Sequence, residues 1–578
     1  MCYNQFMFAS IKNQKTNKWK VAFIIFIVVY VALLLVKTDL GVTGSDSMLL
    51  RTLQAGKPLL LYSPNFPINW VKMGRFVPMV CMEYNILNLF SKSPAAFWYY
   101  FIHAVQYVLF MYLFAKIISK FTKSKFLIYM IPVLVSVTPG MILAWFQTMY
   151  LERDLIFFIT IFIFFYLLYL ERPKISYLVL GLISVNLFLY YKEAAFIPVG
   201  AFAFFHLIFS WMNSGKPAKN LNNDNPKEKL PDLSGKAIIF DALVLLSSIM
   251  FLAIYFFFVF LPYKGALSYN QIYSFSNLIK NILNYAFVVD PVVMFVVLPL
   301  AIWRVYKIFI KRDKPEVIYD SLLAAGTMYV FSFFVLNLFN VYYFAPVYIF
   351  FVPALIYFVP KIWDGKIVWK ILVYVLGIII IFNTLPSSLH WLTYSKYMPI
   401  NLNKTLDFLV KDIKSKPDKR ANLFLDGAER CGDKWVYFNF SEFLLYKGLT
   451  AKQFDLKSDQ EKTPNCTTTI PVDIPLNQFT VFNGGPLPKI AKGDYLIVTP
   501  ESTDSVRNNS DQAYLKSLEN DYNLVFRTRS LLAFPMLDLK EILRYFLSIG
   551  ASPNERFLGI SRKQPNMLWP DYYVFVRK

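Results

Sequence analysis

Residues Gly41 to Arg75, GVTGSDSMLLRTLQAGKPLLLYSPNFPINWVKMGR, decide how the chain is organised because they follow the first long apolar run. The stretch is too polar and too rich in Gly and Pro to cross a bilayer, although it carries apolar pieces of helix length. Asp46 lies near its start, Arg51 follows, and Arg75 ends it. We predict that it belongs to a first outer loop, residues 37–96, with juxtamembrane helices.

The composition is typical of a membrane protein. Of the 578 residues, 56% are hydrophobic and only 17% are charged. Apolar runs recur along the chain, and a run of about 17 to 25 residues spans a hydrocarbon core of roughly 30 Å. The formal net charge of +22 comes largely from short basic segments beside these runs. This distribution follows the positive-inside rule for cytoplasmic loop ends, so we predict no nucleic-acid partner.

Charges at the span ends predict about eleven transmembrane helices with a cytoplasmic N-terminus. The segment 76–90 is short and contains Glu83, so we expect a buried or interfacial helix there rather than a crossing. The polar, lysine-rich and Pro-rich segment 212–236 is typical of a flexible cytoplasmic linker. The predicted spans are 21–36, 97–114, 126–145, 155–170, 175–189, a sixth ending near Trp211, 237–261, 285–302, 319–339, 342–359 and 367–382.

The composition changes near residue 386 to that of a soluble domain. Strand-like runs alternate there with helix-like pieces, which favours an α/β layer. We therefore predict a transmembrane domain, residues 1–385, followed by an extracytoplasmic α/β domain, residues 386–578. The strand-like runs are 422–425, 495–499, 523–526 and 572–576, and the helix-like pieces are 512–519 and 537–546.

This topology gathers polar side chains from separate loops on the outer face of the membrane. A carboxylate can take a proton from a hydroxyl acceptor, and cations can stabilise a phosphate that leaves. The cluster therefore suits a reaction between an anionic, lipid-linked donor and a hydroxyl acceptor. Its members are Asp46, Arg51, Arg75, Glu152, Arg153, Asp154, Lys192 and Glu193.

The first loop carries a resemblance to a known superfamily. Asp46, followed by Arg51 and the Gly-Lys-Pro turn at 56–58, resembles the start of the GT-C glycosyltransferases, such as lipid A aminoarabinose transferases and protein O-mannosyltransferases. The pair Gly74-Arg75, expected to open a helix, is similar to the phage and bacterial glucosyltransferases that decorate O-antigens. The resemblance implies a GT-C-like helical membrane fold.

Three later motifs extend the resemblance. LERD at 151–154 is similar to the second acidic motif of these enzymes, at the outer end of the third span. YKEAAFIP at 191–198 resembles their Lys-containing motif at the start of the sixth span. YYFAP at 342–346 resembles the aromatic-Pro start of a late span. The motifs are short, so they specify the superfamily better than the subfamily.

The resemblance implies transfer of a sugar from a polyprenyl-phosphate donor to a glycan such as lipopolysaccharide or O-antigen, to a lipid or to a protein. It implies an enzyme of the inner (plasma) membrane that contacts membrane lipids, with a donor-synthesising glycosyltransferase and a flippase as further partners. Asp46 would be the general base, with Glu152 and Asp154 also catalytic. The substrate-binding residues would be Arg51, Arg75, Arg153, Lys192, Glu193, Tyr342 and Tyr343.

A divalent cation is an open question at this stage. Many of these enzymes carry a paired acidic motif in the first loop, whereas Ser45 and Ser47 flank a single Asp46 here. If a hard cation is used, Asp46, Glu152 and Asp154 are the oxygen ligands available to it.

The cysteines and histidines add little to the site. Cys431 and Cys466 both lie in the outer domain and would form a disulfide in an oxidising compartment. The histidines His103, His206 and His390 are scattered without metal spacing, so we expect satisfied packing for them.

Each candidate residue also has a structural interpretation. Asp46 can cap a helix, and the charges of LERD can form a solvated loop or an internal ion pair. Lys192 can snorkel from a span end with Glu193 as its partner. Arg51 and Arg75 can bind lipid head groups, and the Tyr342-Tyr343 pair can belong to an interfacial aromatic belt.

Two rival functions use the same kind of membrane scaffold. An O-antigen polymerase or ligase typically depends on a large periplasmic loop between late spans, whereas this chain has its large outer mass at the C-terminus. A transporter or flippase of lipid-linked sugars should place charges in mid-span, whereas the charges here gather at span ends.

Overall fold

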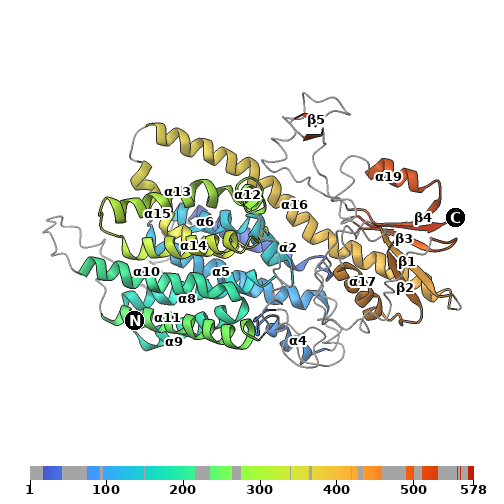
Figure 1. Cartoon of the computed structure of the whole chain (residues 1–578), viewed down its shortest axis with the longest axis horizontal. Helices are drawn as coiled ribbons and strands as arrows, with labels where there is room; N and C mark the ends of the chain where they lie inside the picture. The colour runs from blue at the N-terminus through green and yellow to red at the C-terminus, as the bar shows by residue number, and fades with distance from the viewer. Residues whose placement is uncertain are drawn as a thin grey trace, which may run out of the picture.

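The fold joins a bundle of apolar helices to a β-sheet at one end of the bundle (Figure 1). It is described by a computed structural model. The residues described are 17–41, 74–91, 95–148, 150–214, 235–262, 275–338, 340–363, 367–417, 419–426, 434–458, 490–499, 511–530, 556–557, 560–561 and 571–578. The predictions for Asp46, Arg51, Cys431, Cys466 and the helix-like piece 537–546 lie outside these residues.

Seven helical segments of the described chain are long and apolar enough to cross a membrane. This confirms the prediction of a polytopic helical membrane protein, although the number of crossings remains a prediction. The seven are α2 (Lys18–Leu35), α5 (Ala96–Phe121), α8 (Glu152–Glu171), Glu193–Asn213 with α10 (Phe196–Ser214), Ala237–Phe260 with α11 (Gly235–Tyr255) and the π-helix η3 (Phe256–Phe260), Val293–Ile310, and α14 (Val317–Val335).

Another of the seven segments is composite, and two further apolar helices are shorter than a full crossing. The segment Val293–Ile310 is built from the π-helix η5 (Val293–Val297), α13 (Leu298–Val305) and the π-helix η6 (Tyr306–Ile310), and it is preceded by α12 (Phe275–Asn284) and the π-helix η4 (Tyr285–Val289). Two apolar helices are shorter than a full crossing: α9 (Ile175–Tyr191), and Ala345–Lys361, which joins η7 (Ala345–Val347) to α15 (Tyr348–Trp363).

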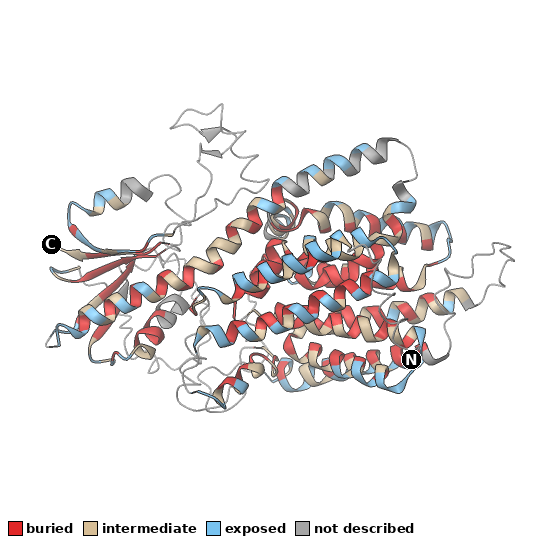
Figure 2. Cartoon of the chain, turned by 180° about the vertical axis from the view of Figure 1, so that it is seen from behind, coloured by how far each residue is buried: buried red, intermediate tan, exposed pale blue. Residues whose placement is uncertain are grey.

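The burial pattern of the bundle supports a lipid environment. Buried residues face the interior of the bundle, and exposed residues lie along its outer helix faces (Figure 2). Many exposed side chains are large and apolar, which is unusual for a surface in water and normal for one in lipid. Along α5 alone these are Phe97, Trp98, Phe101, Val105, Val108, Leu109 and Tyr112.

The predicted span 126–145 is a bent pair of helices that together are long and apolar enough for a broken span or a re-entrant loop, so the crossing itself stays a prediction. The chain forms α6 (Lys125–Ser136) and α7 (Pro139–Phe146), which meet at an angle of 69°. Thr138 is extended, as expected for a residue before proline, and Pro139 then fits the first helical position because that position needs no N–H partner. Every residue of α7 is buried, so the broken helix ends inside the protein.

The segment 76–90 does not cross the bundle, as expected. It contains only two short helices, η1 (Met82–Tyr84) and α4 (Asn85–Asn88), and the next residues, Leu89 and Phe90, are 81% and 82% exposed. Gly74 and Arg75 do not open a helix, which corrects the expectation. Gly74 has a positive φ of 74°, and Pro78 disfavours helical backbone at the residue before it.

Helix α16 (Ile367–Lys414) links the bundle to the sheet and has 48 residues (Figure 1). It runs through residue 386, where the composition changes, without a break. Two of its side chains hydrogen-bond to residues 33–40, at the end of α2 and the start of the first loop. Lys396 donates from Nζ to the carbonyl oxygens of Leu33 and Val36 at the end of α2, both at 2.7 Å, and Asn403 donates to the carbonyl of Leu40 at 2.6 Å.

The sheet has five strands in the order β2-β1-β3-β7-β4. Strands β1 and β2 are parallel, β3 is parallel to β1, and β7 is antiparallel to both β3 and β4. Four strands coincide with the four predicted runs: β1, β3, β4 and β7. The bounds are β1 (Ala421–Asp426), β2 (Phe454–Ser458), β3 (Tyr495–Val498), β4 (Tyr522–Arg527) and β7 (Tyr573–Arg577), with helices α17 (Lys434–Tyr446) and α19 (Asp511–Leu518) and a small hairpin of β5 (Arg556–Phe557) and β6 (Ile560–Ser561).

The entry to the first loop lies at the junction of bundle and sheet domain. A Cβ atom on Gly41 would lie 3.0 Å from the Leu402 side chain of α16 and 3.1 Å from the Phe443 ring of α17. Gly41 also has a φ of 130°, which strains any residue with a Cβ atom, so both the backbone and the close side chains favour glycine at this position. The chain enters 42–73, which carries Asp46, from a point fixed by both helices.

Candidate active site at the sheet end of the bundle

The charged motifs of the sequence meet at the end of the bundle that faces the sheet. LERD forms the first turn of α8, and Lys192 and Glu193 lie between α9 and α10, where η2 (Glu193–Ala195) begins. Arg75 lies in the segment before η1. Their side chains form three groups of ion pairs, centred on Arg153, Lys192 and Arg75.

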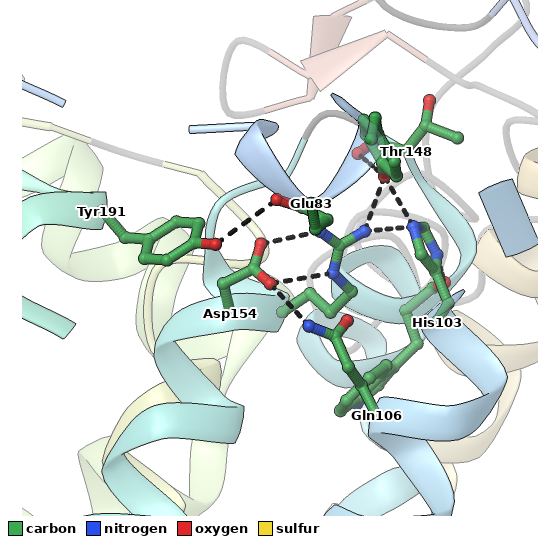
Figure 3. Close-up of polar contacts among 9 residues, drawn as sticks. Glu83, His103, Gln106, Thr148, Asp154 and Tyr191 are labelled. Atoms are coloured by element: carbon green, nitrogen blue, oxygen red, sulfur yellow. Dashed lines mark hydrogen bonds and ion pairs between the residues drawn. The ribbon is translucent and has the colours of Figure 1, made fainter. Parts of the chain in front are cut away.

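Arg153 is the centre of the most buried group, and its side chain is only 1% exposed. Figure 3 shows the polar contacts of this group, with Glu83, His103 and Asp154 among the residues labelled. Its Nη2 contacts Asp154 Oδ2 at 2.7 Å and also pairs with Glu83 Oε1. Its Nη1 donates to the hydroxyl of Tyr84 at 2.7 Å and to Nε2 of His103. The guanidinium is thus enclosed by acceptors on four side chains, as a buried charge requires.

The C-terminal end of α7 and the residues after it support this group with carbonyl oxygens. Nδ1 of His103 contacts the carbonyl oxygen of Trp145, in the last turn of α7, at 2.9 Å, which makes Nδ1 the donor and leaves Nε2 as an acceptor for Arg153. The Tyr84 hydroxyl donates to the carbonyl of Thr148, two residues after α7, at 2.7 Å. The end of the bent pair α6 and α7 therefore supplies backbone acceptors to the charged group.

The group around Arg153 holds more negative than positive charge. Glu83 and Asp154 share one guanidinium, and Gln106 and Tyr191 donate to them at 3.0 and 3.3 Å. Burial and the nearby Asp154 carboxylate raise the pKa of Glu83 to about 7, although Arg153 acts in the opposite direction. Glu83 therefore takes up a proton near neutral pH.

Lys192 is the centre of the second group and is buried. Its Nζ pairs with Glu152 Oε1 and lies 4.2 Å from the centre of the Tyr343 ring and 5.7 Å from that of Phe333. These two rings stack on each other at 4.6 Å. The Lys192 ammonium is thus held by one carboxylate and two ring faces. Unlike the Arg153 guanidinium, it is not enclosed by acceptors on four side chains.

Arg75 and Glu193 form the third group, which is the most open of the three, with exposed side-chain fractions of 16% and 15%. Arg75 Nε donates to Glu193 Oε1 at 2.7 Å, and the backbone N–H of Phe76 donates to the same oxygen at 2.9 Å. Glu193 is thus the partner of Arg75, which corrects the alternative that paired it with Lys192.

The two predicted tyrosines differ in their surroundings. Tyr343 contacts Lys192, whereas the Tyr342 ring lies 4.1 Å from the ring of Tyr150, just before LERD. The YYFAP motif therefore packs against both acidic motifs of the bundle. An aromatic belt alone does not account for a ring placed over a buried lysine.

An apolar cavity of about 770 Å³ has Lys192 and Glu193 in its lining. Helices α10, α11 and α14 line it with residues such as Phe196, Phe204, Leu252 and Phe331. Its two charged residues are neighbours in the sequence, and most of the remaining lining is apolar. This lining fits an amphiphile with an anionic head and a long hydrocarbon chain.

The carboxylates predicted as metal ligands are neutralised by cations. Glu152 pairs with Lys192, and Asp154 pairs with Arg153. Across the described ranges, no group of three or more His, Cys, Asp or Glu side chains is placed to hold a metal ion. Asp46, the third predicted ligand, lies outside those ranges, so metal binding stays a prediction.

Sequence reasoning missed several polar residues of this region. The sequence predicts an interfacial helix around Glu83 and a packed side chain for His103, yet both residues contact Arg153. Asp39 lies at the root of the first loop, where burial raises its pKa to about 6. Asp290, before η5, accepts from the Tyr348 hydroxyl with both oxygens at 2.8 Å. An isolated acid next to an apolar run was the available signal in each acidic case.

The spans also contain a polar group far from this site, which corrects the expectation that charges gather only at span ends. In the bundle interior, Asp241 of α11 accepts from the Tyr166 hydroxyl of α8 at 2.7 Å and contacts His206 Nδ1 of α10 at 2.7 Å. All three residues are buried. His206 is thus a member of a hydrogen-bonded triad.

The fold and these ion pairs define a helical membrane protein with charged residues in the wall of an apolar cavity. No protein-family model and no curated protein matches the chain. Among solved structures, it is similar to the oligosaccharyltransferase of Archaeoglobus fulgidus in the apo form, with a TM-score of 0.39 and 12% identity, over 75% of this chain and 64% of that one. The chain thus spans less than two thirds of that protein's length, and a likeness of this degree assigns no function.

Proposed function

We propose that the protein is a GT-C-like glycosyltransferase that moves a sugar from a polyprenyl-phosphate donor to an acceptor at the extracytoplasmic face of the inner (plasma) membrane. The observation that carries the proposal is the apolar cavity of about 770 Å³ with Lys192 and Glu193 in its wall. A polyprenyl phosphate has the same division between an anionic head and a long apolar chain.

The donor would lie with its hydrocarbon chain between α10, α11 and α14. Its phosphate would be held at the charged part of the cavity by Lys192 and Arg75. Cations at this position stabilise the phosphate as the bond between it and the sugar breaks, because negative charge develops on the leaving oxygen. Tyr343 would keep Lys192 in place beneath the phosphate.

Asp46 would serve as the general base for the acceptor hydroxyl. The acceptor proton passes to the Asp46 carboxylate, the acceptor oxygen bonds to the anomeric carbon, and the bond from that carbon to the phosphate oxygen breaks. The polyprenyl phosphate leaves with the bonding electron pair. The fixed entry to the first loop at Gly41, five residues before Asp46, supports this placement.

The remaining groups would position the acceptor. Glu152 or Asp154 would accept from its hydroxyls, or bind a divalent cation together with Asp46. Arg51, Arg153, Glu193 and Tyr342 remain proposed contacts of the substrates. The acceptor would be a glycan, a lipid or a protein, and a donor-synthesising glycosyltransferase and a flippase would supply the donor.

A transporter of lipid-linked sugars is the second candidate, because the triad of Tyr166, His206 and Asp241 lies inside the bundle. Buried ionisable groups within spans often mark transport pathways. Incubation of the purified protein with a radiolabelled polyprenyl-phosphate sugar and a panel of acceptors separates the two. A glycosyltransferase yields a new labelled glycoside, whereas a transporter yields none and moves the intact lipid across a vesicle membrane.

A further inference from the structure

The carboxylate of Glu193 is held as a bound anion would be. One oxygen, Oε1, accepts both from Arg75 Nε at 2.7 Å and from the backbone N–H of Phe76 at 2.9 Å. A guanidinium and a backbone amide that converge on one oxygen form an arrangement equally suited to a phosphate oxygen.

The segment that carries both donors of this anion site is anchored. Gly74 adopts a φ of 74°, and its carbonyl accepts from the Tyr255 hydroxyl of α11 at 3.2 Å. The segment that carries Arg75 and Phe76 is therefore attached to one of the cavity helices. Tyr255 and Glu193 both line the cavity, so the anion site lies at its wall.

The Glu193 pair differs from the other ion pairs in its accessibility. Arg75 and Glu193 are 16% and 15% exposed, whereas the side chains of Lys192 and Glu152 are 7% and 2% exposed. A partly exposed pair costs less to separate than a more deeply buried one, because water reaches both charges more readily once they part. The Glu193 carboxylate is thus the anion at this cavity that an incoming ligand displaces most easily.

We propose that Glu193 occupies the donor-phosphate position when the donor is absent and exchanges with that phosphate during each cycle. The inference rests on the proposed function. The phosphate, which carries more charge and more acceptor oxygens, takes Arg75 and the Phe76 N–H, and Glu193 turns toward solvent. After transfer, the returning carboxylate competes with the polyprenyl-phosphate product and speeds its release.

This exchange predicts an unusual effect of Glu193→Gln. The amide keeps an acceptor oxygen for Arg75 and Phe76 but removes the negative charge that competes with phosphate. We expect about tenfold tighter binding of a polyprenyl phosphate, because the neutral amide accepts from Arg75 more weakly than the carboxylate and so competes less with the phosphate. The KM for the donor should fall together with kcat, since the product leaves more slowly. A carboxylate that only braces Arg75 would give weaker or unchanged binding.

The test measures equilibrium binding to the full-length protein in nanodiscs with three probes: a long-chain polyprenyl phosphate, phosphatidic acid and inorganic phosphate. Glu171→Gln is the matched control, because it removes the carboxylate of the exposed Lys120–Glu171 pair, which lies at the other end of α8. Glu193→Asp is the second variant. Its shorter side chain withdraws from Arg75 without loss of charge and should also bind the polyprenyl phosphate more tightly than the wild type.

Tighter binding of polyprenyl phosphate by both Glu193 variants, but not by the control, supports the exchange, and the gain should vanish in an Arg75→Gln background. Unchanged or weaker binding overturns it. Equal gains for phosphatidic acid and polyprenyl phosphate, or a gain for inorganic phosphate alone, overturn the assignment of the site to the donor. Failure of the wild-type protein itself to bind polyprenyl phosphate overturns the proposed function, and the exchange with it.

Discussion

Replacement of Arg153 by Met should strongly destabilise the protein. Met has a similar length and flexibility, so it fills the space without charge. It leaves the buried carboxylates of Glu83 and Asp154 without their shared cation, and His103 and Tyr84 without a donor. Removal of one partner of a buried ion pair costs about 3–5 kcal/mol, and we expect a loss in this range.

Glu83→Gln should cost less, about 1 kcal/mol, because Arg153 keeps Asp154 as a full counter-charge. The double variant leaves one unpaired carboxylate instead of two, so its destabilisation should be smaller than the sum by about 1–2 kcal/mol. Unfolding in mixed micelles, followed by tryptophan fluorescence, gives the four free energies of this cycle. Arg172→Met is the control, since Arg172 is exposed at the other end of the same helix.

A free energy of unfolding for Arg153→Met within about 0.5 kcal/mol of the wild type would refute the reasoning. Additive effects of the two substitutions would refute the sharing of one guanidinium by two carboxylates. The first result would mean that the group around Arg153 is solvated in the membrane and that its contacts contribute nothing to stability. The second would mean that Glu83 and Asp154 interact with Arg153 independently.

Three further predictions concern the same end of the bundle. Asp46→Asn should lower the rate of sugar transfer by about 100-fold to 10,000-fold while the protein still folds, because the acceptor loses its base; full activity in a glycoside-forming assay would exclude Asp46 from that role. Lys192→Met should lower kcat/KM for the donor by about 10-fold to 100-fold, whereas Lys174→Met, an exposed lysine at the opposite end of α9, should have no effect; equal effects would exclude Lys192 from phosphate binding. Glu83→Gln should remove a pH dependence of stability. The raised pKa of Glu83 means that the folded protein binds a proton more tightly than the unfolded chain between about pH 4.5 and about pH 7, so wild-type stability should fall as pH rises through this window. Unfolding curves at several pH values check this, and an unchanged slope in the variant contradicts it.

The helices could be predicted from the sequence because a long apolar run lies in lipid. There the backbone N–H and C=O groups find no water and must bond to each other within a helix. The bend between α6 and α7 could not, because Pro139 lies within a run whose composition still suits a span. The continuity of α16 was hidden for a similar reason: Pro386 lies where the composition changes, yet the helix continues through it. Hydropathy reports the environment of a residue, whereas a break depends on local backbone contacts.

The site was predicted in part. LERD and YKEAAF do meet at one end of the bundle, as the charge rule implied. Their partners could not be assigned, because Arg153 is paired with Glu83 across 70 positions of sequence and with His103 across 50. Such pairings depend on how the helices are rotated about their axes, and a hydropathy pattern in uniformly apolar helices leaves that rotation undetermined.

Helix α16 gives the sheet and the first loop a common mechanical support. Its 48 residues correspond to a rod about 72 Å long, more than twice the roughly 30 Å of a hydrocarbon core. The rod reaches the sheet at one end, and on its way it holds the end of α2 through Lys396 and the root of the first loop through Asn403. If a bulky acceptor tilted the sheet, α16 would move with it. The contacts of Lys396 and Asn403 would then shift the point from which the loop with Asp46 begins.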